Sequence, residues 1–194
     1  MNDLQIKQRT DQFQFFGNYL QNIPGNIVEC GVGNGNTLAI LCQVFPDRQI
    51  IGIDSFNGFP KNSITEYDNE FSKNRVKTIN NRDKSYHSLE HVSEKVLQHH
   101  NDVKFIKGYF EDILPQQYSF GPIALLHLDC DIYSSYRAAF SLYPQVVTNG
   151  IIAFDEYNSK WTGATKAIDK FLEEHGLKIH CYKVSEYIKY YTFR

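Results

Sequence analysis

Short apolar runs alternate along this chain with segments in which apolar residues recur at helical spacing. Apolar runs of four to eight residues bounded by turn signals are typical of buried strands. Such strands are predicted at residues 26–30, 49–54 and 103–107 and within the runs 123–131 and 150–156. Helices are predicted at residues 7–21, 37–45, 88–100, 134–146 and 162–175. This alternation indicates βαβ units and a mostly parallel, Rossmann-like α/β sheet with helices on both faces.

The end of the chain departs from this alternation. Residues 177–193 alternate enough to form two final strands, joined near Ser185 and Glu186 as an antiparallel hairpin, so the sheet is expected to have seven strands. Asn36 and Ser88 are predicted to cap the N-termini of their helices, and Gly176 to end the last helix. No internal repeat or linker is visible, so residues 1–194 are predicted to form a single domain.

One polar stretch has no clear period. Residues 57–84 are rich in Asn, Lys and Asp and show neither helical nor strand spacing. A loop of this length is uncommon in a compact domain unless it serves the function. We therefore expect these residues to form a lid or an acceptor-binding insert.

Composition excludes several classes of protein. The 13 Tyr and 14 Phe in 194 residues are enough aromatic side chains for a packed core, so intrinsic disorder is not expected. A net charge of -2 without a long basic run argues against nucleic-acid binding. No stretch approaches the ~20 apolar residues of a membrane span, and the first residues lack the layout of a signal peptide.

The cysteines indicate a reducing compartment. Cys30, Cys42, Cys130 and Cys181 form no C-x-x-C motif and are predicted to be buried thiols. The cytoplasm is therefore the expected location. The sequence does not decide between a monomer and a homo-oligomer.

Two of the predicted strands end in paired acids. Asp129 and Asp131 end one apolar run, and Asp155 and Glu156 end the next. Because a parallel α/β sheet gathers ligands at the carboxyl ends of its strands, the four carboxylates are expected to meet at one edge. Their mutual repulsion calls for a cation, and oxygen-only ligands suit Mg²⁺ or a similar hard metal. Either pair could instead be structural, with Asp131 as a helix cap and the second pair as a solvated strand end.

A glycine-rich turn follows the first strand and opens the next helix. Its pattern is Glu29-x-Gly31-x-Gly33-x-Gly35, in which the glycines let a ligand approach the backbone closely. Asp54 lies 21 positions after Gly33, where a carboxylate can bind both hydroxyls of a ribose. In the dinucleotide fingerprint G-x-G-x-x-G the third glycine comes one residue later, so another adenosine cofactor is favoured. The structural alternative is a glycine-rich turn without a ligand.

These segments resemble a known class of enzyme. Residues 28–35 resemble the first motif of class I S-adenosylmethionine (SAM)-dependent methyltransferases. Four further segments are similar to the macrocin O-methyltransferase family, at residues 54–60, 108–115, 128–135 and 155–157. The likeness runs from about Ile27 to Leu172 with the motifs in order. Because that family methylates sugar hydroxyls with a divalent metal, the resemblance implies a SAM- and Mg²⁺-dependent O-methyltransferase acting on a small hydroxylated acceptor.

The resemblance also implies roles for individual residues. Asp129, Asp155 and Glu156 would hold Mg²⁺, and Asp131, with Asp129, would be catalytic, Asp131 as the general base. The family usually has Asp where this chain has Glu156, whose side chain is one methylene longer. The residues implied to bind the cofactor are Glu29, Gly31, Gly33, Asn36, Thr37, Asp54, Ser55, Tyr109, Phe110 and Asp129.

The sequence leaves several alternatives open. Tyr109 and Phe110 could flank the adenine or only pack the core, and His127 could face the site or be packed within its strand. A catechol would offer a metal two adjacent oxygens, as a sugar diol would. A nicotinamide-dependent oxidoreductase is disfavoured by the glycine spacing and leaves the acids without a role. A non-catalytic SAM-binding protein would keep the fold without the reaction.

Overall fold

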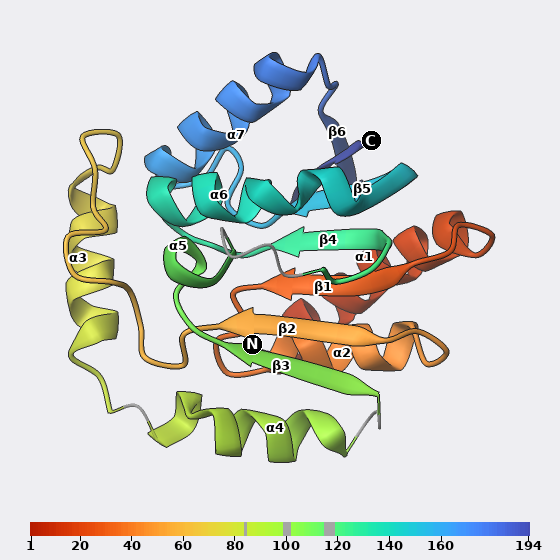
Figure 1. Cartoon of the computed structure of the whole chain (residues 1–194), viewed down its shortest axis with the longest axis horizontal. Helices are drawn as coiled ribbons and strands as arrows, with labels where there is room; N and C mark the ends of the chain where they lie inside the picture. The colour runs from red at the N-terminus through yellow and green to blue at the C-terminus, as the bar shows by residue number, and fades with distance from the viewer. Residues whose placement is uncertain (84, 99–101, 115–118) are drawn as a thin grey trace.

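A seven-stranded sheet forms the centre of the computed structural model, which describes residues 1–83, 85–98, 102–114 and 119–194 (Figure 1). The strand order is β3-β2-β1-β4-β5-β7-β6. The parallel strands are β1 (Asn26–Cys30), β2 (Ile50–Asp54), β3 (Val103–Lys107), β4 (Ile123–Leu128) and β5 (Val146–Phe154). β7 (Tyr187–Phe193) pairs antiparallel with β5 and with β6 (His180–Val184). The predicted Rossmann-like sheet and its terminal hairpin are confirmed.

Helices cover both faces of the sheet. α1 (Asp3–Leu20), α2 (Asn36–Val44) and α4 (Leu89–Leu97) pack on one face, with strand residues such as Ile27 and Leu125. α5 (Phe110–Ile113), α6 (Tyr133–Ala139) and α7 (Thr162–His175) pack on the other, with strand residues such as Val28 and Leu126. Successive strand residues therefore enter two separate cores. Burial on both faces explains why the strands are continuous apolar runs in the sequence.

α1 begins at Asp3 rather than at the predicted Lys7. The Asn2 side chain accepts a hydrogen bond from the backbone N–H of Gln5, and the Gln5 side chain accepts one from Asn2, both at 2.9 Å. This reciprocal capping box extends the helix beyond its apolar stripe. The stripe itself, which includes Phe13 and Leu20, is fully buried as predicted.

The cap of α2 differs from the prediction. The N-cap is Gly35, in the left-handed region at φ 77°, and Asn36 is the first helical residue. The Asn36 side chain accepts a hydrogen bond from Lys95 of α4 instead of capping its own helix. The predicted cap of α4 is confirmed, because the Ser88 side chain accepts a hydrogen bond from His91. The predicted end of that helix at residue 100 lies outside the described residues. Pro115, the last residue of the segment 108–115 that resembles the methyltransferase family, also lies outside them.

The helix predicted over residues 134–146 is two elements. α6 ends at Ala139 and continues as the 3₁₀ helix η3 (Phe140–Gln145), after which Val146 begins β5. Pro144 is the physical reason, because proline lacks an N–H and its ring clashes with the carbonyl four residues earlier. The N-cap of α6 is Ile132, without a side-chain hydrogen bond, so neither Asp131 nor Ser134 caps this helix.

The polar stretch 57–84 contains a helix that its sequence pattern did not reveal. α3 (Glu70–Asn80) buries only Ser72 and Val76, a face too narrow to produce a clear apolar period. The helix stands beside the carboxyl ends of β1, β2 and β4 (Figure 1). The Asp68 carboxylate anchors it, since it accepts hydrogen bonds from Thr65 and from the backbone N–H of Tyr133 at the start of α6. A short 3₁₀ helix, η1 (Ser85–His87), follows.

The end of α7 and the burial of the cysteines can also be compared with the predictions. α7 ends at Gly176, in the left-handed region at φ 63°, as predicted. Cys30, Cys42 and Cys130 are buried free thiols, but Cys181 is exposed, contrary to the prediction, because it lies on the edge strand β6. Within the described residues, no helix is both long and apolar enough to cross a membrane.

The ends of β1 and β4 approach each other too closely for a side chain. The backbone N–H of Asp129 donates to the carbonyl oxygen of Cys30 at 2.9 Å. A Cβ atom at Gly31, where φ is 94°, would lie 1.8 Å from the carbonyl oxygen of Asp129. The absence of a side chain at Gly31 therefore lets the start of the glycine-rich loop lie against the end of β4.

Gly31→Ala should lower the free energy of unfolding by about 3 kcal/mol or more, because a left-handed backbone and a steric clash combine. Gly33→Ala is the matched control, with φ at 55° but nothing within 4 Å of its added Cβ atom. Its expected loss is about 1 kcal/mol. Urea denaturation of both variants without ligand measures the difference. Equal losses would show that the contact with Asp129 does not constrain Gly31.

Candidate active site

A cavity of about 400 Å³ lies where β1, β2, β3 and β4 end. The residues implied for cofactor binding that line it are Gly31, Gly33, Asn36, Thr37, Asp54, Ser55, Tyr109, Phe110 and Asp129. Glu29 is the one implied cofactor residue that does not line it, and its side chain is fully buried. Part of the wall comes from the insert, through residues 57–60, Ile79 and Arg82. The insert thus borders the cavity that the glycine-rich loop opens.

Asp54 is held against the glycine-rich loop. The backbone N–H of Gly33 donates to Asp54 Oδ2 at 2.9 Å, and that of Phe56 donates to Oδ1 at 2.7 Å. Burial raises the pKa of Asp54 despite these hydrogen bonds, which lower it. The 21-residue spacing noted in the sequence therefore corresponds to a direct contact between the loop and the end of β2.

Tyr109 and Phe110 both line the cavity, but in different ways. Phe110 also belongs to the apolar core of its face and is 9% exposed. The Tyr109 hydroxyl accepts a hydrogen bond from Asn57, at the start of the insert, at 3.3 Å. Phe110 can therefore pack in the core and also border a bound ligand.

Three of the predicted acids converge beside this cavity. One carboxylate oxygen each of Asp129, Asp155 and Glu156 lie within 4.8 Å of one another. Asp129 and Asp131 line the cavity, whereas Glu156 is 4% exposed beneath it. This burial excludes the solvated strand end as a description of the second pair.

Burial and mutual repulsion disfavour the charged forms of Asp129, Asp131 and Glu156. Burial and the neighbouring Asp155 raise the pKa of Asp129 to about 6. Burial, together with Asp129 and Asp155, raises the pKa values of Asp131 and Glu156 well above their usual range. The carboxylates therefore lie close enough to repel one another, and a bound cation would stabilise their charged forms.

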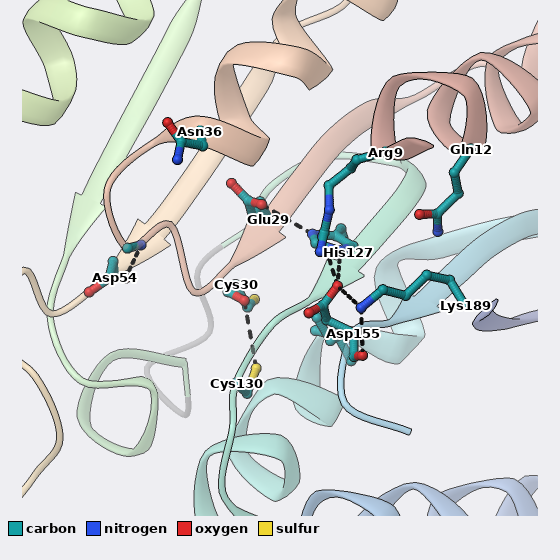
Figure 2. Close-up of polar contacts among 12 residues, drawn as sticks. Arg9, Gln12, Glu29, Cys30, Asn36, Asp54, His127, Cys130, Asp155 and Lys189 are labelled. Carbon is teal, nitrogen blue, oxygen red and sulfur yellow. Dashed lines mark hydrogen bonds and ion pairs between the residues drawn. The ribbon is translucent and has the colours of Figure 1, made fainter. Parts of the chain in front are cut away.

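Asp155 differs from the other acids because two cations neutralise it. Arg9 Nη1 and Lys189 Nζ each lie 2.7 Å from Asp155 Oδ1 (Figure 2). Burial would raise the pKa of Asp155, but Arg9 and Lys189 hold it far below its usual value. Sequence reasoning missed both cations. A single Arg in α1 and a single Lys in β7 carry no motif, and only the fold brings them together.

Glu156 also shapes the backbone at Asp131. Its Oε2 atom lies 2.6 Å from the Tyr136 hydroxyl and 3.4 Å from the backbone nitrogen of Asp131. Asp131 adopts φ 63°, in the left-handed region that Asp tolerates better than most residues. The longer Glu side chain therefore reaches the turn that carries Asp131.

His127 lies inside the protein, next to this cluster. Its Nδ1 atom is 3.1 Å from Glu29 Oε1, and its Nε2 atom is 4.0 Å from Asp155 Oδ1 (Figure 2). The ring of Phe13 packs edge-on against it, with ring centroids 5.3 Å apart. Burial and the nearby Arg9 lower the pKa of His127 to about 3, so the imidazole is neutral. His127 is thus a packed strand histidine whose second nitrogen faces the acids.

Residues 7–192 match a family model described as Macrocin-O-methyltransferase (TylF). The chain belongs to this family. It is therefore a SAM-dependent methyltransferase, and neither a nicotinamide-dependent oxidoreductase nor a non-catalytic binding protein. No curated protein matches the chain.

Solved methyltransferase structures have the same fold as this family member. The O-methyltransferase NovP has a TM-score of 0.79 and 22% identity over 96% of this chain and 79% of NovP. The calicheamicin methyltransferase CalS11 has a TM-score of 0.66 and 22% identity over 95% of this chain and 77% of that one. An apo structure of CalS11 is described as a TDP-rhamnose 3'-O-methyltransferase. TomG from Streptomyces achromogenes, in complex with SAM, has a TM-score of 0.61 and 11% identity over 99% of this chain and 79% of TomG.

Lys189→Met should lower the free energy of unfolding at pH 7 by about 2 kcal/mol, because Asp155 keeps only one of its two buried cations. Lys183→Met, on the exposed side of the same hairpin, is the control and should change it by less than about 0.5 kcal/mol. Chemical denaturation at matched pH measures both. A loss no larger in the first variant would mean that Lys189 does not neutralise Asp155.

Proposed function

We propose that this methyltransferase transfers the methyl group of SAM to a hydroxyl of a small acceptor, assisted by Mg²⁺ or a similar divalent cation. The acceptor is a sugar or a sugar-containing natural product. The observation that carries the proposal is the convergence of Asp129, Asp155 and Glu156 within 4.8 Å of one another, beside a cavity that Asp131 also lines.

The donor set fits a hard divalent cation. All three groups are carboxylates, the oxygen ligands that Mg²⁺ prefers. A cation at this position would stabilise the charged forms of Asp129 and Glu156, whose pKa values burial raises. The ion pairs that the described residues make with Asp155 all use Oδ1, so Oδ2 is a candidate ligand atom. A bound cation would supply Lewis acidity that lowers the pKa of an acceptor hydroxyl.

The remaining residues would position the donor and take the proton. Asp54 would bind the ribose hydroxyls of SAM, and the backbone of residues 31–35 would lie against the cofactor. The acceptor oxygen forms a bond to the methyl carbon as the bond from sulfur to carbon breaks, which leaves S-adenosylhomocysteine. The hydroxyl proton passes to the Asp131 carboxylate, which lines the cavity beside the acidic cluster. Because the displacement is in line, the rate depends mainly on how donor and acceptor are positioned.

A second cavity supports a hydroxylated acceptor. It measures about 340 Å³ and is bordered by Met1 and Arg9, which also line the cofactor cavity. Its other lining residues are Gln5, Gln8, Glu186, Tyr187 and Lys189. The Gln5, Gln8 and Glu186 side chains can hydrogen-bond several sugar hydroxyls, more than the two oxygens of a catechol would engage. A sugar is therefore favoured over a catechol.

Asp131→Asn should reduce kcat by about 100-fold or more, because the amide cannot accept the hydroxyl proton. Asp129→Asn should abolish metal-dependent turnover, because it removes a carboxylate ligand of the cation. Calorimetry should give wild-type SAM affinity for both variants. Asp47→Asn, in an exposed turn, is the control. Full activity of Asp129→Asn, or of the wild type in excess EDTA, would contradict the metal-assisted reaction.

Mg²⁺ or Mn²⁺ should bind at least ten times more tightly at pH 7.5 than at pH 5.5. The pKa of Asp129, raised to about 6, and the raised pKa of Glu156 mean that these carboxyl groups take up protons as the pH falls, and a cation must displace those protons. Calorimetry in buffers of different ionisation enthalpy counts the released protons, and Glu156→Gln should release fewer. An affinity independent of pH would contradict the role of these carboxylates as ligands.

A further inference from the structure

We propose that Glu29 is a positioning residue that acts through His127 on Asp155 and does not bind the cofactor. The inference rests on the proposed function, in which Asp155 is a metal ligand. It gives the acid before the glycine-rich loop a role in the metal site, through contacts in the protein interior. The evidence is a chain of contacts that joins β1 to β5 through β4.

The chain of contacts lies in the protein interior. Glu29 on β1 is 0% exposed and His127 on β4 is 1% exposed, and β1 and β4 pair so that these two residues stand opposite each other. Glu29 Oε1 lies 3.1 Å from His127 Nδ1. Glu29 borders no part of the cofactor cavity, although Gly31, two residues later, does. A ligand in that cavity therefore does not contact Glu29.

The second imidazole nitrogen is directed at Asp155. His127 Nε2 lies 4.0 Å from Asp155 Oδ1, the oxygen that Arg9 and Lys189 also contact. Three groups from three elements, α1, β4 and β7, thus surround one carboxylate oxygen. Together they limit how Asp155 can rotate and hold its carboxylate within reach of Asp129 and Glu156.

Glu29 determines which imidazole nitrogen carries hydrogen. Asp155 is an anion, so a neutral imidazole is favoured with its hydrogen on Nε2, facing that anion. Nδ1 is then the acceptor, and Glu29 must donate to it as a carboxylic acid. Complete burial, which raises the pKa of Glu29 well above its usual value, supports this protonated form. Within the described part of the chain, Glu29 Oε2 is buried without a hydrogen-bond partner, which an anion would tolerate poorly.

This arrangement predicts that an amide can replace Glu29. In Glu29→Gln the side-chain NH₂ group can donate to His127 Nδ1 and preserve the tautomer, whereas Glu29→Leu removes the donor at similar size. Glu29→Gln should bind SAM and Mn²⁺ within about twofold of the wild type. Glu29→Leu should bind SAM normally but Mn²⁺ about tenfold more weakly. Electron paramagnetic resonance of free Mn²⁺ and calorimetry with SAM measure the two affinities.

A double-mutant cycle tests whether Glu29 acts through His127. His127→Gln should weaken Mn²⁺ binding about as much as Glu29→Leu, and the double variant should be no weaker than His127→Gln alone. Additive losses would overturn the proposal, because Glu29 would then act by another route. A loss of SAM affinity in Glu29→Gln would also overturn it, since Glu29 would then be a cofactor ligand that needs its charge.

Nitrogen NMR of the imidazole separates this inference from the proposed function. The His127 signals, assigned by their loss in His127→Gln, should show hydrogen on Nε2 in the wild type and in Glu29→Gln, without added metal. If the wild type binds no Mn²⁺, the proposed metal-assisted reaction is wrong. The position of the imidazole hydrogen still tests the contact between Glu29 and His127. Hydrogen on Nδ1 in the wild type would contradict the proposed donation by Glu29.

Discussion

The repulsion among carboxylates at the carboxyl ends of β4 and β5 is the constraint on which the rest of the site depends. Asp129, Asp131, Asp155 and Glu156 are gathered by strand pairing alone, because the two strands are parallel neighbours and each ends in acids. These carboxylates are stabilised in different ways. Asp155 has Arg9 and Lys189, while burial raises the pKa values of Asp129 and Glu156. In the proposed reaction, a divalent cation would offset the negative charge that Arg9 and Lys189 leave uncompensated.

The same constraint ties distant parts of the chain to the site. Arg9 comes from the first helix and Lys189 from the last strand, and both reach one oxygen of Asp155. Phe13, one helical turn beyond Arg9, covers His127 on the same side. The first helix is therefore part of the electrostatic environment of the acids as well as a cover for the sheet.

Periodicity and strand-end chemistry could be predicted from the sequence, whereas side-chain partners could not. The strands, the hairpin and the cap at Ser88 follow from local patterns, and membership of the methyltransferase family agrees with the motif order. Pro144 divided a predicted helix because its effect on the preceding turn outweighs the apolar spacing. α3 escaped notice since only Ser72 and Val76 of that helix are buried. Arg9 and Lys189 had no sequence signal, because long-range ion pairs depend on how the helix and the hairpin pack.

The close approach at Gly31 has a consequence for how such an enzyme can diversify. The loop that opens the cofactor cavity and the strand that carries Asp129 are joined through the backbone, by the hydrogen bond from Asp129 to Cys30 and by the absence of a Cβ atom between them. The distance between the glycine-rich loop and Asp129 is then set by the pairing of β1 with β4 rather than by any side chain. The insert around α3 lies outside that pairing, so its sequence can change without altering the distance between the glycine-rich loop and Asp129.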